Sequence, residues 1–398
     1  MTNITQNSKI TNLQFVTILI CFLMNMLDGM DVMVISYTAP AIAKEWAIEP
    51  AQLGIVFSAG LLGMAIGAMF LASKADIIGR RAMILLSAAI MGLCVWCTIL
   101  AQNVETLLVI RFISGVGIGS MLASTATLAS EYSPTKTKDF WVSFVMAGYP
   151  IGAVLSGLVA ATVIPLYGWQ SIFKMAGIIS FITLPIVLLY LNESNEFSTK
   201  STIKSKISVG NLLTEKYRKT TIWLWIGIFM AFASLYFLTT WIPKLASATG
   251  LSVELAIYAG TIFNLGAFCG IVSQGYFSNK FGLTKTIFVY LLITALLMLI
   301  FGFIKDSYMI LILFGFIGFG IQGGFVGMYS LAARLYPTDI RATGVGGAVG
   351  IGRIGAIFGP LLGGMLIAAG FSMGTNFVVF SIPTIIAGLV TLLSNSKK

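Results

Sequence analysis

The chain contains no histidine, and only 4 of its 398 residues are cysteine. Without an imidazole, and with neither a metal-ligand cluster nor a nucleophile paired with a base, the sequence argues against an enzyme. Cys94 and Cys97 have the spacing of a redox or metal motif, but they lie in an apolar stretch where cysteines pack as small hydrophobes. We therefore expect no metal and no other cofactor.

Charge is scarce as well: Asp, Glu, Lys and Arg make up 10% of the chain, against 58% hydrophobic residues. Soluble globular domains carry about 25% charged residues, so this composition indicates a polytopic membrane protein. The sequence has no GxxxxGK[ST] phosphate-binding loop, which argues against ATP hydrolysis. The net charge of +10 does not indicate nucleic acid, because the basic residues lie in short segments between apolar runs.

Apolar windows of about 20 residues, long enough for a helix to cross a bilayer, recur along the whole chain. The predicted fold is all-α with twelve transmembrane helices. The expected spans are 13–37, 51–72, 83–101, 106–129, 140–164, 170–191, 220–242, 254–278, 285–304, 308–333, 342–367 and 371–394. The polar and basic stretch 192–219 predicts a cytoplasmic linker between two six-helix bundles, 1–191 and 220–398.

Eighteen of the 24 basic residues fall on one side of these spans, whereas the opposite side receives only Lys44, Lys244 and Lys305. By the positive-inside rule, both termini are expected in the cytoplasm. The expected location is a bacterial inner (plasma) membrane. Three basic residues remain for the spans themselves, namely Arg111, Lys174 and Arg353.

Residues typical of turns and close packing recur at a constant offset of 203. The matched pairs include Gly63 and Gly266, Gly67 and Gly270, Gly115 and Gly318, and Pro134 and Pro337. Such an order indicates duplication of a six-span unit, with both copies in the same orientation. The paired GxxxG spacings predict two equivalent helix crossings.

Asp28 and Asp31 lie near the middle of the first span, three residues apart and so on one helix face. A carboxylate at that depth is costly and must face the protein or a water-filled cavity. We expect the pair to handle protons or substrate; the alternative is that it only joins helices by hydrogen bonds. Gly29, between them, leaves room for a partner helix or a substrate.

Arg353, flanked by glycines in the eleventh span, and Arg111, in the fourth, could replace the hydration of an anion. Snorkelling to the outer surface is the alternative for Arg111. An aromatic substrate needs stacking surfaces, for which the sequence offers Tyr37, Tyr149, Phe263 and Tyr329, although such rings in spans more often pack helices.

The stretch 72–81 contains Asp76, Gly79, Arg80 and Arg81 and resembles the loop signature between the second and third helices of the major facilitator superfamily. These residues are expected to latch two bundles at the cytoplasmic face. Glu131 and Arg334 are matched by the repeat offset, and we expect them to pair across the two halves. The alternative is an ordinary solvated charged surface.

More specific elements are Asp28-Gly29-Met30-Asp31, Gly148-Tyr149-Pro150, Tyr336-Pro337-Thr338 and Gly350-Ile351-Gly352-Arg353-Ile354-Gly355. Together they resemble the aromatic acid:proton symporter family, over residues 13–394. The resemblance implies proton-coupled import of a small aromatic carboxylate by alternating access, with Asp28 and Asp31 coupling protons and Arg353 binding substrate. Expected partners are that anion, protons and the lipid bilayer, without nucleic acid, for a monomer.

Other interpretations remain at this level. The substrate could be another organic anion, such as nicotinate, muconate or an aliphatic acid. A drug/proton exporter would prefer cations or neutral lipophiles, whereas basic residues in the spans favour an anion. A transporter-like sensor would need a signalling extension, for which this sequence leaves little room outside the spans.

Overall fold

The computed structural model describes residues 10–134, 137–193, 212–215, 217–337 and 340–394. Regular structure in these ranges is entirely helical. Twelve helical segments of the described chain are long and apolar enough to cross a membrane. The predicted all-α fold with twelve transmembrane helices is thus confirmed.

The chain forms two compact units: unit 1 is Met1–Ala41 with Ala59–Ile203, and unit 2 is Ile42–Ser58 with Lys204–Lys398. The early helices are α1 (Asn12–Glu45), α2 (Pro50–Ile66), η1 (Gly67–Leu71), η2 (Ala72–Lys74), α3 (Ala75–Ile78), α4 (Arg80–Thr98), α5 (Val104–Tyr132), α6 (Lys138–Met146), α7 (Gly148–Tyr167) and α8 (Trp169–Tyr190). The later ones are α10 (Arg218–Ala248), α11 (Val253–Phe281), α12 (Leu283–Ile300), η5 (Phe301–Phe303), α13 (Ser307–Leu335), α14 (Arg341–Ala368) and α15 (Met373–Ser394). The predicted linker over 192–219 stays a prediction, because residues 194–211 and 216 lie outside the described ranges.

Short polar side chains start several of the helices. Asn103, Ser252 and Asp306 each accept a hydrogen bond from a backbone N–H three residues later, at the starts of α5, α11 and α13. Such caps satisfy donors that have no partner inside the helix. Helices also continue past the apolar windows, so Lys44 lies in the last turn of α1 and Lys244 within α10 rather than in loops.

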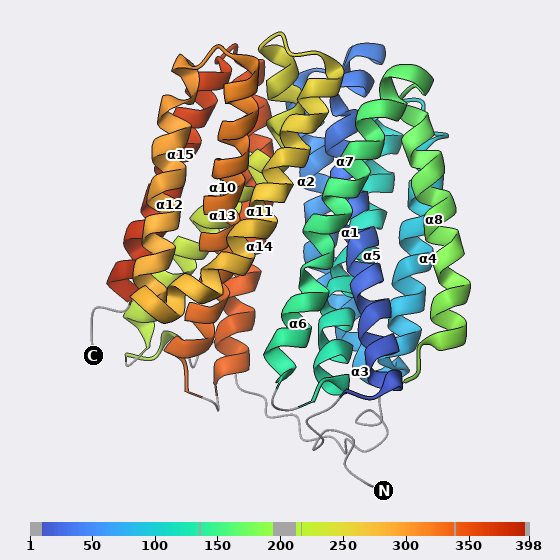
Figure 1. The fold of residues 1–398 in the computed structure, drawn as a ribbon, viewed down its shortest axis with the longest axis vertical. Helices are drawn as coiled ribbons and strands as arrows, with labels where there is room; N and C mark the ends of the chain where they lie inside the picture. Colours follow the sequence, from blue (N-terminus) through green and yellow to red (C-terminus); the bar gives the residue numbers. More distant parts are fainter. Residues whose placement is uncertain (1–9, 135–136, 194–211, 216, 338–339, 395–398) are drawn as a thin grey trace, which may run out of the picture. The chain divides into compact units, whose positions relative to one another are not determined.

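In unit 1, glycines let helix backbones touch. A Cβ atom added at Gly67 would overlap the carbonyl oxygen of Val116 on α5. On the α1–α7 seam, Gly29 lies against the carbonyl of Tyr149, and Gly152 lies against that of Met26. Figure 1 shows α1, α5 and α7 running side by side in this unit. Any side chain at these glycines would force the helices apart.

Unit 2 uses the same device. Gly270 of α11 lies against the carbonyl of Phe319 on α13, and Gly355 of α14 lies against the carbonyl of Phe229 on α10. Each contact lies 203 residues after its counterpart in unit 1. The predicted pair of equivalent GxxxG crossings is therefore confirmed by the backbone geometry.

The first half of α2 belongs to unit 2, where it packs on α14. An added Cβ at Gly54 would lie 2.8 Å from the carbonyl oxygen of Pro360. Ser58 Oγ donates a hydrogen bond to the Ile357 carbonyl at 2.8 Å. The remainder of α2, from Ala59 onward, belongs to unit 1. One continuous helix is thus shared by both units.

Candidate functional site

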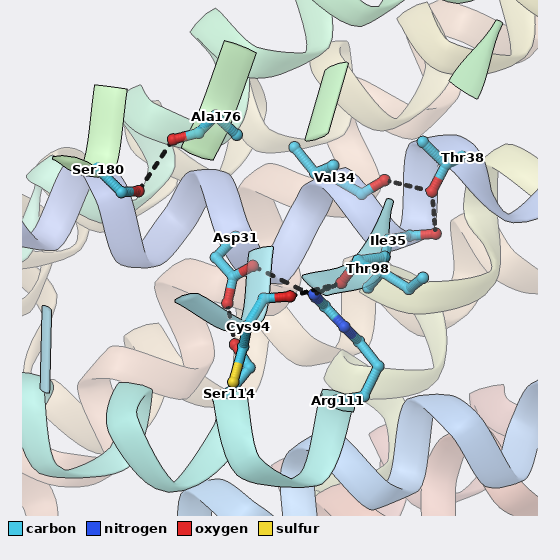
Figure 2. Close-up of polar contacts among 10 residues, drawn as sticks. All are labelled: Asp31, Val34, Ile35, Thr38, Cys94, Thr98, Arg111, Ser114, Ala176 and Ser180. Atoms are coloured by element: carbon cyan, nitrogen blue, oxygen red, sulfur yellow. Dashed lines mark hydrogen bonds and ion pairs between the residues drawn. The ribbon is translucent and has the colours of Figure 1, made fainter. Parts of the chain in front are cut away.

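A buried ion pair joins α1 to α5 in unit 1 (Figure 2). Arg111 Nη1 lies 3.3 Å from Asp31 Oδ1, and the two residues are 4% and 2% exposed. Removing either partner would leave an uncompensated buried charge. The ionisation of Asp31 therefore depends on its pairing with Arg111. Arg111 therefore points into unit 1 and does not snorkel to the surface.

Three further residues complete this ion pair. Ser114 Oγ donates to Asp31 Oδ2 at 2.5 Å, and Arg111 Nη2 donates to Thr98 Oγ1 at 2.9 Å. The Arg111 guanidinium also lies over the ring of Phe173 on α8, 5.6 Å from its centroid. The sequence analysis missed all three, although Ser114 stands one turn after Arg111 and so shares its helix face.

Asp28 lies one turn before Asp31 on α1 and is 1% exposed. One turn further, Asn25 Nδ2 donates a hydrogen bond to Thr125 Oγ1 of α5 at 2.9 Å. The carboxylate pair thus lies on the face of α1 that packs into unit 1. Its predicted role with protons is not decided by this placement and stays a prediction.

In unit 2, Arg353 of α14 is 7% exposed, and its Nη1 donates to the Tyr236 hydroxyl of α10 at 3.3 Å. The Gly352 backbone beside it packs closely on the Phe232 ring, because an added Cβ would come within 2.6 Å of that ring. Glycine next to the arginine thus lets the Phe232 ring lie against the α14 backbone.

Four aromatic rings form what we call the Arg353 cluster: Phe232 and Tyr236 on α10, and Phe325 and Tyr329 on α13. The ring centroids of Phe232 and Phe325 are 4.7 Å apart, and those of Phe325 and Tyr329 are 5.2 Å apart. Each helix contributes an i, i+4 pair, so both rings lie on one face. Sequence reasoning selected Tyr329 and Arg353 but missed the other three.

The remaining aromatic candidates take part in contacts between helices. Tyr37 is fully buried, and its hydroxyl donates to the Ala153 carbonyl of α7 at 2.9 Å. Phe263 is fully buried in α11, with its carbonyl against Gly318 of α13. Tyr149 contributes its carbonyl to the contact with Gly29. Substrate contacts at these three rings stay predictions.

At the turn between α3 and α4, Gly79 has a φ of +100°, which favours glycine over other residues. The carboxylate of Glu193, which follows α8, accepts hydrogen bonds from the backbone N–H groups of Arg80 at 2.9 Å and Arg81 at 3.1 Å. A carboxylate at a helix start also complements the helix dipole. Glu193 was missed because it lies 113 residues from Arg80. The side chain of Asp76 lies outside the described part of the structure.

Glu131 has a different partner from the one its repeat position predicted. Its Oε1 lies 3.3 Å from Arg80 Nη2, within unit 1. Arg334, at the end of α13, is exposed, and pairing between Glu131 and Arg334 stays a prediction.

Two residues after Arg334, burial raises the pKa of the Tyr336 phenol, against the effect of its hydrogen bond to Thr221. The phenol is therefore neutral near pH 7 and acts as the donor.

Comparisons with known proteins agree with this architecture. The Major Facilitator Superfamily profile matches residues 21–274 and 224–398. The chain is 30% identical to the 4-hydroxybenzoate transporter PcaK of Acinetobacter baylyi, over 98% of this chain and 93% of that protein. It is 29% identical to a gallate transporter of Pseudomonas putida, over 98% and 94% of the two chains.

Solved structures share the fold at low sequence identity. A bacterial homologue of the human lysosomal transporter Spinster superposes with a TM-score of 0.83 at 17% identity, and covers 98% of both chains. A D-xylose–proton symporter superposes with a TM-score of 0.79 at 18% identity, over 96% of this chain and 97% of that one.

Proposed function

This chain belongs to the Major Facilitator Superfamily of membrane transporters, and on that premise we propose that it imports a small aromatic carboxylate together with protons, by alternating access. The names of its relatives support an aromatic acid, since 4-hydroxybenzoate and gallate both combine a benzene ring with a carboxylate. We place both termini in the cytoplasm of a bacterial inner membrane, and the functional protein is a monomer.

The Arg353 cluster is the observation that supports an aromatic carboxylate as the substrate. A guanidinium binds a carboxylate through two parallel hydrogen bonds, and aromatic faces stack on a ring. Arg353 donates to the Tyr236 hydroxyl at 3.3 Å, and Tyr236 belongs to a cluster of rings from α10 and α13. Charge and aromatic surface thus occur together, as an aromatic monoanion requires.

We assign proton coupling to Asp31, supported by Asp28. Protonation of Asp31 neutralises the carboxylate and ends its charge pairing with Arg111. An arginine released in this way attracts an anion, so protonation and anion binding favour each other. Such positive linkage is what a symporter needs, and Arg111 is then a helper in binding rather than the principal substrate contact.

Gating is assigned to the α3–α4 turn, with Asp76, Gly79, Arg80, Arg81 and Glu131, and to Arg334. The Arg80–Glu131 pair and the Glu193 cap hold this turn within unit 1. Asp76→Asn should slow transport with little change in substrate affinity, because it acts on the gate. Lost binding with normal turnover would contradict this assignment.

Uptake into proteoliposomes tests the proposal. Counterflow should respond to benzoate or hydroxybenzoates more than to muconate, nicotinate, aliphatic acids or lipophilic cations, and accumulation should collapse when a protonophore is added. Arg353→Ala should lose binding, whereas Lys174→Ala, which removes an exposed charge on α8, should not. Accumulation that survives the protonophore, or that requires sodium, would contradict proton coupling.

A further inference from the structure

One face of α1 carries a line of buried polar side chains. Gln14, Thr17, Asn25, Asp28 and Asp31 are each at most 2% exposed. Together with the buried Cys21 thiol, they follow one another at spacings of three or four residues, which places them on one helix face. From Gln14 to Asp31, this face extends for about 25 Å along the helix axis.

The opposite face of the same turns is apolar and exposed. Leu13, Phe15, Val16 and Leu19 are all more than a third exposed. The polar side chains are therefore turned into unit 1, away from lipid. At its N-terminal end the polar face reaches the surface, because Gln14 Oε1 accepts hydrogen bonds from the exposed Thr11, from N at 2.9 Å and Oγ1 at 3.1 Å.

Two atoms on this face lack hydrogen-bond partners among the described residues. Asn25 uses its amide hydrogens on the Cys21 carbonyl and on Thr125 Oγ1, but Asn25 Oδ1 is buried without a partner. Thr17 Oγ1 is buried in the same way. Buried polar atoms of this kind are normally satisfied by ordered water. Both atoms therefore indicate hydration sites along the face.

The repeated half shows that packing does not require this polarity. The positions 203 residues after Cys21, Asn25 and Asp28 lie on α10 and are occupied by Leu224, Ile228 and Ala231. All three are buried, at 2%, 2% and 0% exposure. At these three positions an equivalent helix packs with apolar side chains, so packing does not require the polar groups of Asn25 and Asp28. The positions of Thr17 and Asp31 stay polar in α10, as Thr220 and Ser234.

We propose that the polar face of α1 is the path by which a proton leaves Asp31 for the aqueous phase, with Asn25 and Thr17 holding the water that relays it. This inference rests on the proton coupling proposed above and adds its exit path. The path is confined to unit 1 and ends at Gln14 and Thr11.

The transfer conserves protons. The Asp31 carboxyl O–H bond breaks, its proton joins an adjacent water, and each water passes one proton to the next until one emerges beside Thr11. The Asp31 carboxylate then pairs again with Arg111. Asn25 Oδ1 only accepts a hydrogen bond and orients its water, while the Thr17 hydroxyl can accept from one water and donate to the next.

Thr17→Val removes the hydroxyl with little change of volume, and Asn25→Ile replaces the amide with the bulkier apolar residue found at the equivalent position of α10. In proteoliposomes, net proton-driven uptake and substrate-induced acidification of a trapped pH dye should fall about tenfold. Counterflow exchange, in which the proton need not be released, should stay within twofold. Thr17→Ser, which keeps the hydroxyl, should restore proton flux, and Thr220→Val, the α10 counterpart of Thr17→Val, should change neither activity.

Equal loss of uptake and exchange in folded Asn25→Ile and Thr17→Val would show that both residues have structural roles, and would overturn the inference. Unchanged uptake in both variants would also overturn it. Failure of the proposed function is distinguishable, because wild-type uptake would then be insensitive to a protonophore and would acidify no dye. Gel filtration in detergent identifies a misfolded variant; if Asn25→Ile misfolds, the Thr17→Val and Thr17→Ser pair decides the matter.

Discussion

Units 1 and 2 share a backbone arrangement and differ in the chemistry placed on it. Gly67 meets the Val116 carbonyl in one unit, and Gly270 meets the Phe319 carbonyl in the other, both at the repeat offset. Duplication has therefore preserved the points where helices touch. Close crossings leave little freedom for change, because any side chain there collides with backbone.

Side chains away from the crossings have diverged. The positions of Asp31 and Arg111 are taken in unit 2 by Ser234 and Phe314. Ser234 donates to the Phe380 carbonyl at 3.1 Å, and the Phe314 ring packs against Phe301 with centroids 5.1 Å apart. Unit 1 thus buries an ion pair where unit 2 has aromatic packing. We attribute proton handling to unit 1 and anion binding to unit 2 for this reason.

The α1–α7 contact of unit 1 and the α10–α14 contact of unit 2 show how one backbone arrangement accommodates either an ion pair or aromatic packing. Gly29 lies against the Tyr149 backbone, whereas at the equivalent positions the Phe232 ring lies against Gly352. Glycine and a large residue have exchanged sides. In unit 1 the two backbones touch beside the carboxylates, and in unit 2 a ring packs against the glycine that precedes Arg353.

The largest expected effect follows from breaking the buried pair. Arg111→Ala leaves Asp31 buried without its cation, and should lower the free energy of unfolding by about 3–5 kcal/mol. The double variant Arg111→Ala with Asp31→Asn should recover part of this loss. Thermal unfolding in detergent measures both. If the double variant is no more stable than the single one, the pair is not the source of the effect.

A second experiment tests whether the two crossings are equivalent. Gly67→Ala and Gly270→Ala should each destabilise their units by about 1–3 kcal/mol or more, through overpacking. Gly275→Ala, on α11, is the control, because an added Cβ there meets nothing within 4 Å. Unfolding temperature and folded yield report the result. A large difference between the two variants would contradict the shared frame.

A third experiment compares the contributions of Arg353 and Arg111 to substrate affinity. Arg353→Lys keeps the charge but loses the paired donors, and should raise the substrate Kd about tenfold. Arg111→Lys should change Kd less, since Arg111 is paired with Asp31. Concentration dependence of counterflow provides the measurement. A larger shift for Arg111→Lys would reverse the proposed division of roles.

The smallest effect concerns one hydroxyl. Tyr236→Phe keeps the ring and removes the hydrogen bond to Arg353, and should weaken binding by about 0.5–1 kcal/mol, or two- to fivefold. Tyr308→Phe, at a residue 73% exposed, should have no effect. Unchanged affinity in Tyr236→Phe would mean that this hydroxyl does not position the guanidinium for substrate.

Much of the fold is predictable because insertion in a bilayer imposes long apolar runs and penalises buried charge. Those two rules find all twelve spans and single out Asp28, Asp31, Arg111 and Arg353. They do not find helix ends, because a helix such as α1 continues through polar residues to Glu45 once it leaves the apolar region.

Contacts between distant residues are not predictable in this way. Asp31 and Arg111 are 80 residues apart, so the sequence ranks each as important without joining them. Phe232, Tyr236 and Phe325 are ordinary aromatics in apolar helices until the fold gathers their rings and brings Tyr236 to Arg353. The repeat offset matched Glu131 to Arg334, but an offset identifies equivalent positions and not neighbours, and the structure pairs Glu131 with Arg80.

The helix α2 belongs to both units. Gly54 and Ser58 fix its first half to α14 in unit 2, and from Ala59 onward it continues in unit 1. Under the alternating access proposed above, one unit would rotate against the other, and this rotation would apply force to α2. The helix α2 would then bend, or its contacts with α14 would break. The π-helical turn Gly67–Leu71 at its far end is a place where helices yield. Each cycle of the proposed alternating access would therefore include bending of residues 50–71 or loss of their contacts with α14, whichever substrate is carried.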